Sequence, residues 1–162
     1  VRPGDTVVEL FPGGGWYSEI LAPYLQSGGG TLYVAAPSER GFAGFRRLIE
    51  RDQALYGRVR LATFPVREAG QTGVPDGSAD VVLTFRNVHN WMMGEQPYAD
   101  LAFRQIFAML KPGGVLGVVD HRLPEGASAE RERTSGYVKV STVRRLAEQA
   151  GFVLAGSSEV NA

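Results

Sequence analysis

A run of three glycines near the start of the chain is the feature best suited to bind a ligand. Gly13, Gly14 and Gly15 follow the apolar segment Val7–Leu10, and apolar residues at helical spacing come directly after them. Glycines permit a tight turn, and their backbone can approach a bound molecule closely because they lack a Cβ. Ligands of open α/β sheets bind at the carboxyl ends of strands, where Glu9 stands. The turn therefore predicts a site for a nucleotide-like molecule, although a turn with no ligand is the plainer alternative.

Six residues after a later apolar segment combine side chains suited to proton transfer and hydrogen bonding. Residues 86–91 read Arg-Asn-Val-His-Asn-Trp. His89 can act as a general base near neutral pH, Asn87 can hydrogen-bond a cofactor or a substrate, and Trp91 can form a pocket wall. In the structural alternative, Asn87 and Asn90 cap the loop and Trp91 belongs to the core.

A second polar group, Asp120-His121-Arg122, follows the next apolar segment. If both segments are parallel strands, this group and residues 86–91 lie at the same sheet edge and face the glycines across one pocket. Asp120 and His121 then contact the substrate, or the group is only a salt-bridged loop. Histidine and carboxylate also suit a transition metal. We expect no metal, because the two histidines lack a short ligand spacing such as His-x-x-x-His.

The composition narrows the class of protein and of substrate. The chain has 162 residues, enough for one domain with one core. Lys and Arg number 17, Asp and Glu number 17, and there is no cysteine. The balanced charge gives no indication of nucleic-acid binding, and the missing thiols exclude disulfides and cysteine nucleophiles. No apolar run approaches the roughly 20 residues of a membrane span.

Alternating strand and helix patterns position these groups. Strands are predicted for Thr6–Leu10, Thr31–Ala35, Val59–Phe64, Ala79–Phe85, Val115–Val119 and Phe152–Val160. Helices are predicted for Trp16–Leu25, Phe42–Tyr56, Pro97–Leu110 and Ser141–Ala150, with Ser141 as an N-cap and Gly151 as the stop. Lys111–Gly114 is predicted as a turn, and Pro124–Ser135 as a mobile polar segment. Repeated units of this kind predict an α/β fold: a doubly wound, mostly parallel sheet with helices on both faces.

Three motifs in this order resemble landmarks of the class I S-adenosylmethionine-dependent methyltransferases. They are Glu-Leu-Phe-Pro-Gly-Gly-Gly (9–15), Pro-Asp-Gly-Ser-Ala-Asp-Val-Val (75–82) and Leu-Lys-Pro-Gly-Gly (110–114). Residues 11–17, 86–91 and 135–138 are more narrowly similar to a group of bacterial predicted methyltransferases of unassigned substrate. The resemblance implies a Rossmann-like fold, S-adenosylmethionine as cofactor and methyl transfer as the reaction.

Three positions depart from the family pattern. Phe11 stands where the first of three spaced glycines is usual, and Ala36 stands where an acidic residue usually holds the ribose. Residues 63–66 offer no acidic side chain toward the adenine, although Ser38 or Glu39 can compensate for Ala36. The family's sheet also ends in an antiparallel strand, which this chain lacks. The open alternative is therefore a degenerate methyltransferase fold that binds a small ligand without catalysis.

The sequence and the resemblance together predict two sets of site residues. The cofactor set is Glu9, Phe11, Pro12, Gly13, Gly14, Gly15, Pro37 and Asn87, and the catalytic set is His89, Asn87, Asp120 and His121. Glu159 and Asn161 are expected near the same rim. The expected acceptor is a small molecule, with no nucleic acid and no evident membrane as partner, and a homo-oligomer is left open. Residues 1–162 are read as one methyltransferase-like domain from which flanking segments are missing, so no localisation is predicted.

Overall fold

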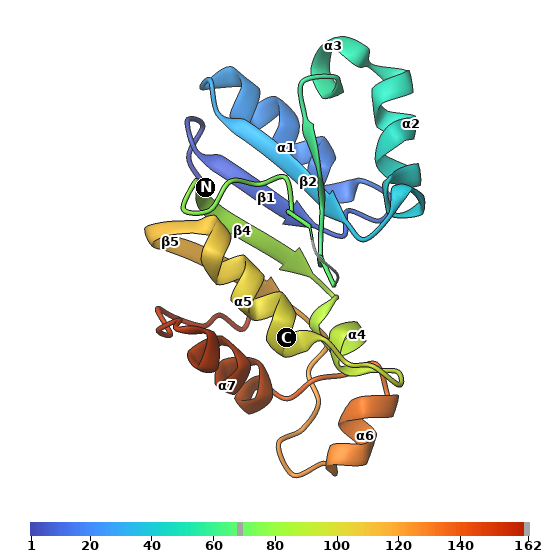
Figure 1. Ribbon diagram of the computed structural model, residues 1–162, viewed down its shortest axis with the longest axis vertical. Helices are drawn as coiled ribbons and strands as arrows, with labels where there is room; N and C mark the ends of the chain where they lie inside the picture. The colour runs from blue at the N-terminus through green and yellow to red at the C-terminus, as the bar shows by residue number, and fades with distance from the viewer. Residues whose placement is uncertain (68–69, 161–162) are drawn as a thin grey trace.

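The sheet that carries the site has five parallel strands in the order β3-β2-β1-β4-β5. The computed structural model describes residues 1–67 and 70–160 (Figure 1). The strands are β1 (Thr6–Leu10), β2 (Thr31–Ala36), β3 (Arg60–Thr63), β4 (Ala79–Phe85) and β5 (Leu110–Val119). The chain runs outward from β1 to β3 and then returns to β4 on the other side of β1. A crevice opens at such a switch point, at the carboxyl ends of β1 and β4.

Helices cover both faces of this sheet. They are α1 (Trp16–Ser27), η1 (Glu39–Phe42), α2 (Ala43–Arg51), α3 (Gln53–Tyr56), α4 (Val88–Met92), α5 (Ala99–Met109), α6 (Ala129–Thr134) and α7 (Val140–Ala150). The core on one face includes side chains of α1, η1, α2 and α3, and the core on the other includes side chains of α4, α5 and α7. The predicted doubly wound fold with a parallel sheet is confirmed. No helix within residues 1–67 and 70–160 is long and apolar enough to cross a membrane.

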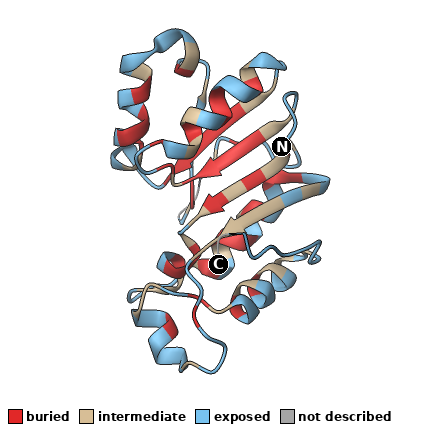
Figure 2. Ribbon diagram, turned by 180° about the vertical axis from the view of Figure 1, so that it is seen from behind, coloured by how far each residue is buried: buried red, intermediate tan, exposed pale blue. Residues whose placement is uncertain are grey.

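The two-residue period of β1 places its side chains in different layers. Val7 packs in the core beneath α1 and α2, whereas Val8 and Leu10 pack in the core beneath α4 and α5. By the same alternation Glu9 lies on the α1 side, where it is 1% exposed. Figure 2 shows β1 and β2 almost wholly buried, in contrast to the half-buried edge strand β5. A carboxyl group is thus built into one of the two most buried strands of the sheet.

Asp80 connects two of the sequence motifs, those at residues 75–82 and 110–114. Its carboxylate accepts hydrogen bonds from the backbone N–H of Thr6 at 2.8 Å and from Lys111 Nζ at 2.7 Å. These contacts, that from Lys111 foremost, lower the pKa of Asp80 from its ordinary value. The residue ties the starts of β1, β4 and β5 together, at the sheet edge opposite the crevice.

Several predicted elements differ in the structure. The single helix predicted for Phe42–Tyr56 is broken at Asp52, whose extended backbone ends α2 and whose Oδ1 caps α3 by accepting from the Leu55 N–H at 3.0 Å. Part of the polar segment 124–135 forms α6, because Ser128 caps it by accepting from the Arg131 N–H. The predicted turn at 111–114 lies within β5, where the register shifts between Ala79 and Val81 of β4.

The end of the chain also differs from the prediction. Lys139, not Ser141, is the N-cap of α7, and the Ser141 hydroxyl instead donates to Glu125. Gly151 ends α7 with φ 109°, as predicted. Residues 152–159 form no strand, and Val153 is 89% exposed. An apolar, β-branched composition is not sufficient for a strand, because the segment does not pair with the outer edge of β5.

Candidate active site

A pocket of about 350 Å³ lies where the order of the strands reverses. The glycine turn after β1, the first residues of α1, the segment after β4 and one residue after β5 contribute to its wall. The residues are Glu9, Phe11, Pro12, Gly13, Gly14, Trp16, Tyr17, Phe85, Arg86, Asn87, His89 and His121. Three segments far apart in the sequence therefore converge here, because their strands are parallel and end at the same edge.

The glycine turn leaves open space on its pocket side. A Cβ built on Gly13 or on Gly14 meets no atom within 4 Å. On its other side the turn is closed, because α2 brings Gly44 directly against the Gly13 carbonyl, at a separation that no Cβ would permit. The backbone of this turn is thus fixed by α2 and bare toward the pocket, which is the arrangement that a close-fitting ligand requires.

We expect Gly15→Ala to destabilise the protein, in contrast to Gly14→Ala. Gly15 caps α1 with φ 89°, and a Cβ there would lie 2.6 Å from Leu48 Cδ1 in the core. A left-handed alanine and this clash should together lower the free energy of unfolding by about 2 kcal/mol. Gly14 has neither constraint, so Gly14→Ala should stay within about 0.5 kcal/mol of the wild type. Urea unfolding measures both; equal losses would contradict the described turn.

Phe11, which departs from the family pattern, has a structural role at the start of the turn. It adopts φ 53°, and its N–H donates to the Ala35 carbonyl at 2.8 Å. If the alternation of β1 continued, the Phe11 ring would lie on the α1 face. The left-handed backbone instead turns the ring toward the core beneath α4 and α5. There it contacts Phe64 and Trp91, each at 6.1 Å between ring centroids. Aromatic packing therefore supports a conformation that glycine usually provides.

Glu9 forms the buried polar floor of the pocket. Its Oε2 accepts a hydrogen bond from Ser18 Oγ on α1 at 2.5 Å, and Ser18 is itself fully buried. Burial raises the pKa of Glu9 from 4.5 to about 7, and the hydrogen bond from Ser18 opposes this increase. The group can thus change its charge near neutral pH, when a ligand with a positive charge enters.

Asn87 joins the ends of β1 and β4. Its Nδ2 donates to the Leu10 carbonyl at 3.2 Å and to Thr84 Oγ1 at 3.1 Å. Both amide hydrogens are thereby used within the fold. Toward a ligand in the pocket, Asn87 can therefore accept a hydrogen bond through Oδ1 but has no donor left.

His89 is fixed by Asp120 from the end of β5. Asp120 Oδ1 lies 2.6 Å from His89 Nδ1, and both side chains are largely buried. The carboxylate also accepts from the backbone N–H groups of His89 at 3.1 Å and of His121 at 2.7 Å. With Asp120 as the acceptor in these contacts, Nδ1 is the nitrogen that donates, and Nε2 is the nitrogen that holds the lone pair in a neutral ring. His89 is 8% exposed and lines the same pocket as Gly13.

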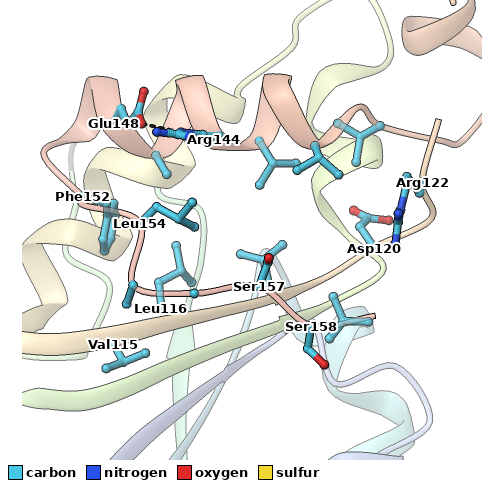
Figure 3. A pocket seen from close by; sticks show the side chains of 18 of the residues that line it. Val115, Leu116, Asp120, Arg122, Arg144, Glu148, Phe152, Leu154, Ser157 and Ser158 are labelled. Atoms are coloured by element: carbon cyan, nitrogen blue, oxygen red, sulfur yellow. Dashed lines mark hydrogen bonds and ion pairs between the residues drawn. The ribbon is translucent and has the colours of Figure 1, made fainter. Parts of the chain in front are cut away.

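A larger groove of about 780 Å³ is shown in Figure 3. His121 lines both this groove and the smaller pocket. The groove lies between β5, α7 and the segment after α7, and its wall includes Leu116, Phe152 and Leu154. Figure 3 shows Asp120 and Arg122 at one end, where Arg122 also donates to Glu159 at 2.6 Å. No residue of the glycine turn lines this groove, so we place the chemistry in the smaller pocket.

The structure brings most of the predicted site residues to the pocket, but not all of them. Gly15 caps α1 behind the turn, Asp120 contacts His89 but lines the larger groove, and Pro37 lies outside the pocket. Trp91 is 0% exposed and belongs to the core. Two further residues were expected near the rim. Glu159 forms an ion pair with Arg122, and Asn161 lies outside the described residues.

Four lining residues are absent from the two predicted sets, although residue 86 belongs to the segment that was expected to face the pocket. These are Trp16, Tyr17, Phe85 and Arg86. Their positions in the sequence could have revealed them, because two follow the glycines directly and two stand where β4 ends. The Tyr17 and Phe85 rings stack at 3.5 Å between centroids and form an aromatic wall.

The side of the crevice expected to meet a ribose has no free acidic group from β2. Ala36 ends the strand, and the Glu39 carboxylate, the predicted compensating group, forms an ion pair with Arg46 of α2. Within residues 1–67 and 70–160, no group of three or more histidine, cysteine, aspartate or glutamate residues is placed to hold a metal ion.

The fold and the pocket define a class: a doubly wound α/β protein with a ligand crevice at a glycine turn. The family model described as "Methyltransferase domain" matches residues 8–118. The chain belongs to this methyltransferase family. The match spans β1 to β5 and so includes the glycine turn, residues 86–91 and the strand before Asp120.

Solved structures show the same fold at low sequence identity. A SAM-dependent methyltransferase from Aquifex aeolicus is 16% identical with a TM-score of 0.69, over 94% of this chain and 74% of that one. The YcgJ protein from Bacillus subtilis is 17% identical with a TM-score of 0.70, over 94% and 63%. The [4+2]-cyclase SpnF is 20% identical with a TM-score of 0.70, over 94% of this chain and 52% of its own, so the chain spans about half its length. No protein with a curated description matches the chain.

Proposed function

We propose that this domain transfers a methyl group from S-adenosylmethionine to a small-molecule acceptor, with His89 as the general base. One observation carries the proposal: the glycine turn and His89, whose ring is held by Asp120, line the same pocket. Family membership implies the cofactor and the reaction. The geometry adds a residue that can accept a proton next to the place where the cofactor would lie.

The residues of the pocket fit the amino-acid end of the cofactor. Gly13 and Gly14 line the pocket with bare backbone, and the space where a Cβ would lie is open at both. Asn87 offers an acceptor oxygen at the β1–β4 junction. Glu9 beneath the turn offers a carboxyl group that ionises more readily beside a positive ligand. When bound, S-adenosylmethionine supplies a methyl group already activated by a positive sulfur.

His89 would act on the acceptor. Its Nε2 would accept the proton that an acceptor hydroxyl or amine loses when its oxygen or nitrogen takes the methyl group and the methyl–sulfur bond breaks, with the electron pair of that bond left on sulfur. Asp120 holds the ring through Nδ1 and stabilises the imidazolium that results. The protein otherwise contributes position, because an in-line displacement depends on the alignment of the two reactants.

Two observations favour a small acceptor. The chain carries equal numbers of basic and acidic residues, so it lacks the net positive charge typical of proteins that bind nucleic acids. The pocket has a volume of about 350 Å³, and aromatic side chains line it, among them Trp16, which is 70% exposed. Such a cavity suits a compact ligand with a planar part.

The second candidate function is binding, or another reaction, without methyl transfer. It is favoured by the absence of an acidic residue at the end of β2, since a ribose there loses charge-assisted hydrogen bonds. The fold itself does not decide, because SpnF shares it and is named as a [4+2]-cyclase.

Transfer of a labelled methyl group separates the two functions. The protein is incubated with S-adenosylmethionine labelled in the methyl group and a pool of small metabolites, and labelled products are counted after the cofactor is removed. The proposal predicts products that form only with active protein. Binding of S-adenosylhomocysteine without any labelled product would favour the binding module instead.

A further inference from the structure

Arg86 is the one arginine or lysine among the described residues that line the pocket. It follows the last residue of β4, is exposed, and lines the pocket beside His89 and His121. Within residues 1–67 and 70–160 its guanidinium forms no hydrogen bond or ion pair. The carboxyl groups of the site are engaged elsewhere, Glu9 with Ser18 and Asp120 with His89.

The backbone of Arg86 is held in a conformation that aims the side chain away from the core. Val82 and Thr84 of β4 are fully buried, Val82 in the core beneath α4 and α5, and strand alternation would direct residue 86 to the same side. Instead Arg86 adopts φ 60°. Among the described residues, only Arg86 and Phe11 combine a side chain with positive φ, and both line this pocket. Strain of this kind persists at sites where it places a side chain for a task.

The position of Arg86 indicates the acceptor rather than the cofactor. The Arg86 N–H donates to the Val119 carbonyl at 2.7 Å, which directs its backbone toward β5, the strand that supplies Asp120 and His121. Asn87, the next residue, turns the other way and bonds the end of β1 beside the glycine turn. At the end of β4, Asn87 thus lies toward the glycine turn, and Arg86 lies toward His89 and Asp120.

We propose that Arg86 binds an anionic group, such as a carboxylate, on the methyl acceptor. This inference rests on the proposed function. The planar guanidinium forms two parallel hydrogen bonds to a carboxylate, and the stacked rings of Tyr17 and Phe85 offer a flat surface beside it. The substrate class is therefore a small, planar organic acid whose nucleophilic atom lies toward His89.

The test uses benzoate as the probe and benzamide as its uncharged equivalent. Each is titrated by calorimetry into protein saturated with S-adenosylhomocysteine, for the wild type, Arg86→Gln, Arg86→Lys and the matched control Arg104→Gln, an exposed arginine on α5. We expect benzoate to bind the wild type and the control alike. Binding should weaken at least about tenfold in Arg86→Gln and less in Arg86→Lys, because lysine keeps the charge but not the planar fork. Benzamide should not distinguish the four proteins.

Equal benzoate affinity in the wild type and Arg86→Gln, or no binding to the wild type, would overturn the inference. So would a tenfold loss of S-adenosylhomocysteine affinity in Arg86→Gln with methylthioadenosine affinity unchanged, because the guanidinium would then belong to the cofactor's own carboxylate. If S-adenosylhomocysteine fails to bind the wild type, the proposed function fails. Benzoate titrated into ligand-free protein then still decides the role of Arg86.

Discussion

His89→Gln is expected to lower kcat for methyl transfer by about a thousandfold, the largest effect predicted for any single side chain of the pocket. Glutamine has a similar length but cannot accept a proton at neutral pH. His89 contacts Asp120 rather than the glycine turn, so the affinity for S-adenosylhomocysteine should change by less than about threefold. Turnover is measured with an acceptor identified in the labelled-pool assay, and cofactor affinity by calorimetry.

Asp120→Asn tests the same mechanism through the orientation of the ring. An asparagine amide can donate to Nδ1, which would move the imidazole hydrogen to Nε2 and remove the base. We expect kcat to fall by about a hundredfold or more while cofactor affinity persists, and the dependence of kcat on pH to change its form. If His89→Gln keeps more than a tenth of the wild-type kcat, the acceptor needs no base from this residue and the assignment is wrong.

Glu9→Gln is expected to remove a pH dependence of stability worth about 3 kcal/mol. The folded protein holds the Glu9 proton up to a pKa of about 7, whereas the unfolded chain releases it near 4.5. The folded state therefore binds more protons between these values, so the stability of the wild type falls as the pH rises from about 4.5 to about 7 and then levels off. The difference of pKa corresponds to about 3 kcal/mol at about 1.4 kcal/mol for each unit.

Urea unfolding at a series of pH values measures this effect. Glu9→Gln should lack the fall and should be more stable than the wild type above pH 7, since a neutral amide costs less to bury than a carboxylate. Glu50→Gln, which changes an exposed carboxylate on α2, serves as the matched control and should keep the wild-type profile. Parallel profiles for the wild type and Glu9→Gln would show that Glu9 titrates as an ordinary exposed carboxyl group.

The fold could be predicted from the sequence to the extent that it depends on local pattern. The β1 strand, the glycine turn and β4 are recognisable because each combines a period with turn residues, and parallel pairing follows from their alternation with helices. The break at Asp52 was missed because the apolar spacing continues across it, and only the cap to Leu55 reveals it. The predicted strand at 152–160 failed because a strand depends on a partner, which composition does not specify.

The candidate site shows the same division. The sequence placed Gly13, Asn87 and His89 together because parallel strands end at one edge, and they line one pocket. The direction of a side chain was harder to predict, because one residue with positive φ reverses the alternation of a strand. Phe11 and Arg86 both do this, one toward the aromatic core and one toward the pocket. The sequence left open whether Trp91 lines the pocket or belongs to the core. Its direction depends on the short helix α4, which buries it completely.

The most direct test of the central claim, that the pocket at the glycine turn holds the methyl-donor cofactor, is a calorimetric titration of S-adenosylhomocysteine into three proteins. They are the wild type, Gly14→Leu and Gly126→Leu. A Cβ at either glycine meets no atom within 4 Å and neither glycine has a positive φ, but only Gly14 lines the pocket. We predict that the wild type and Gly126→Leu bind with equal affinity. Gly14→Leu should lose at least about a hundredfold in affinity, because its side chain fills the space beside the turn. Unchanged affinity in Gly14→Leu, or no binding by the wild type at millimolar ligand, would contradict this claim.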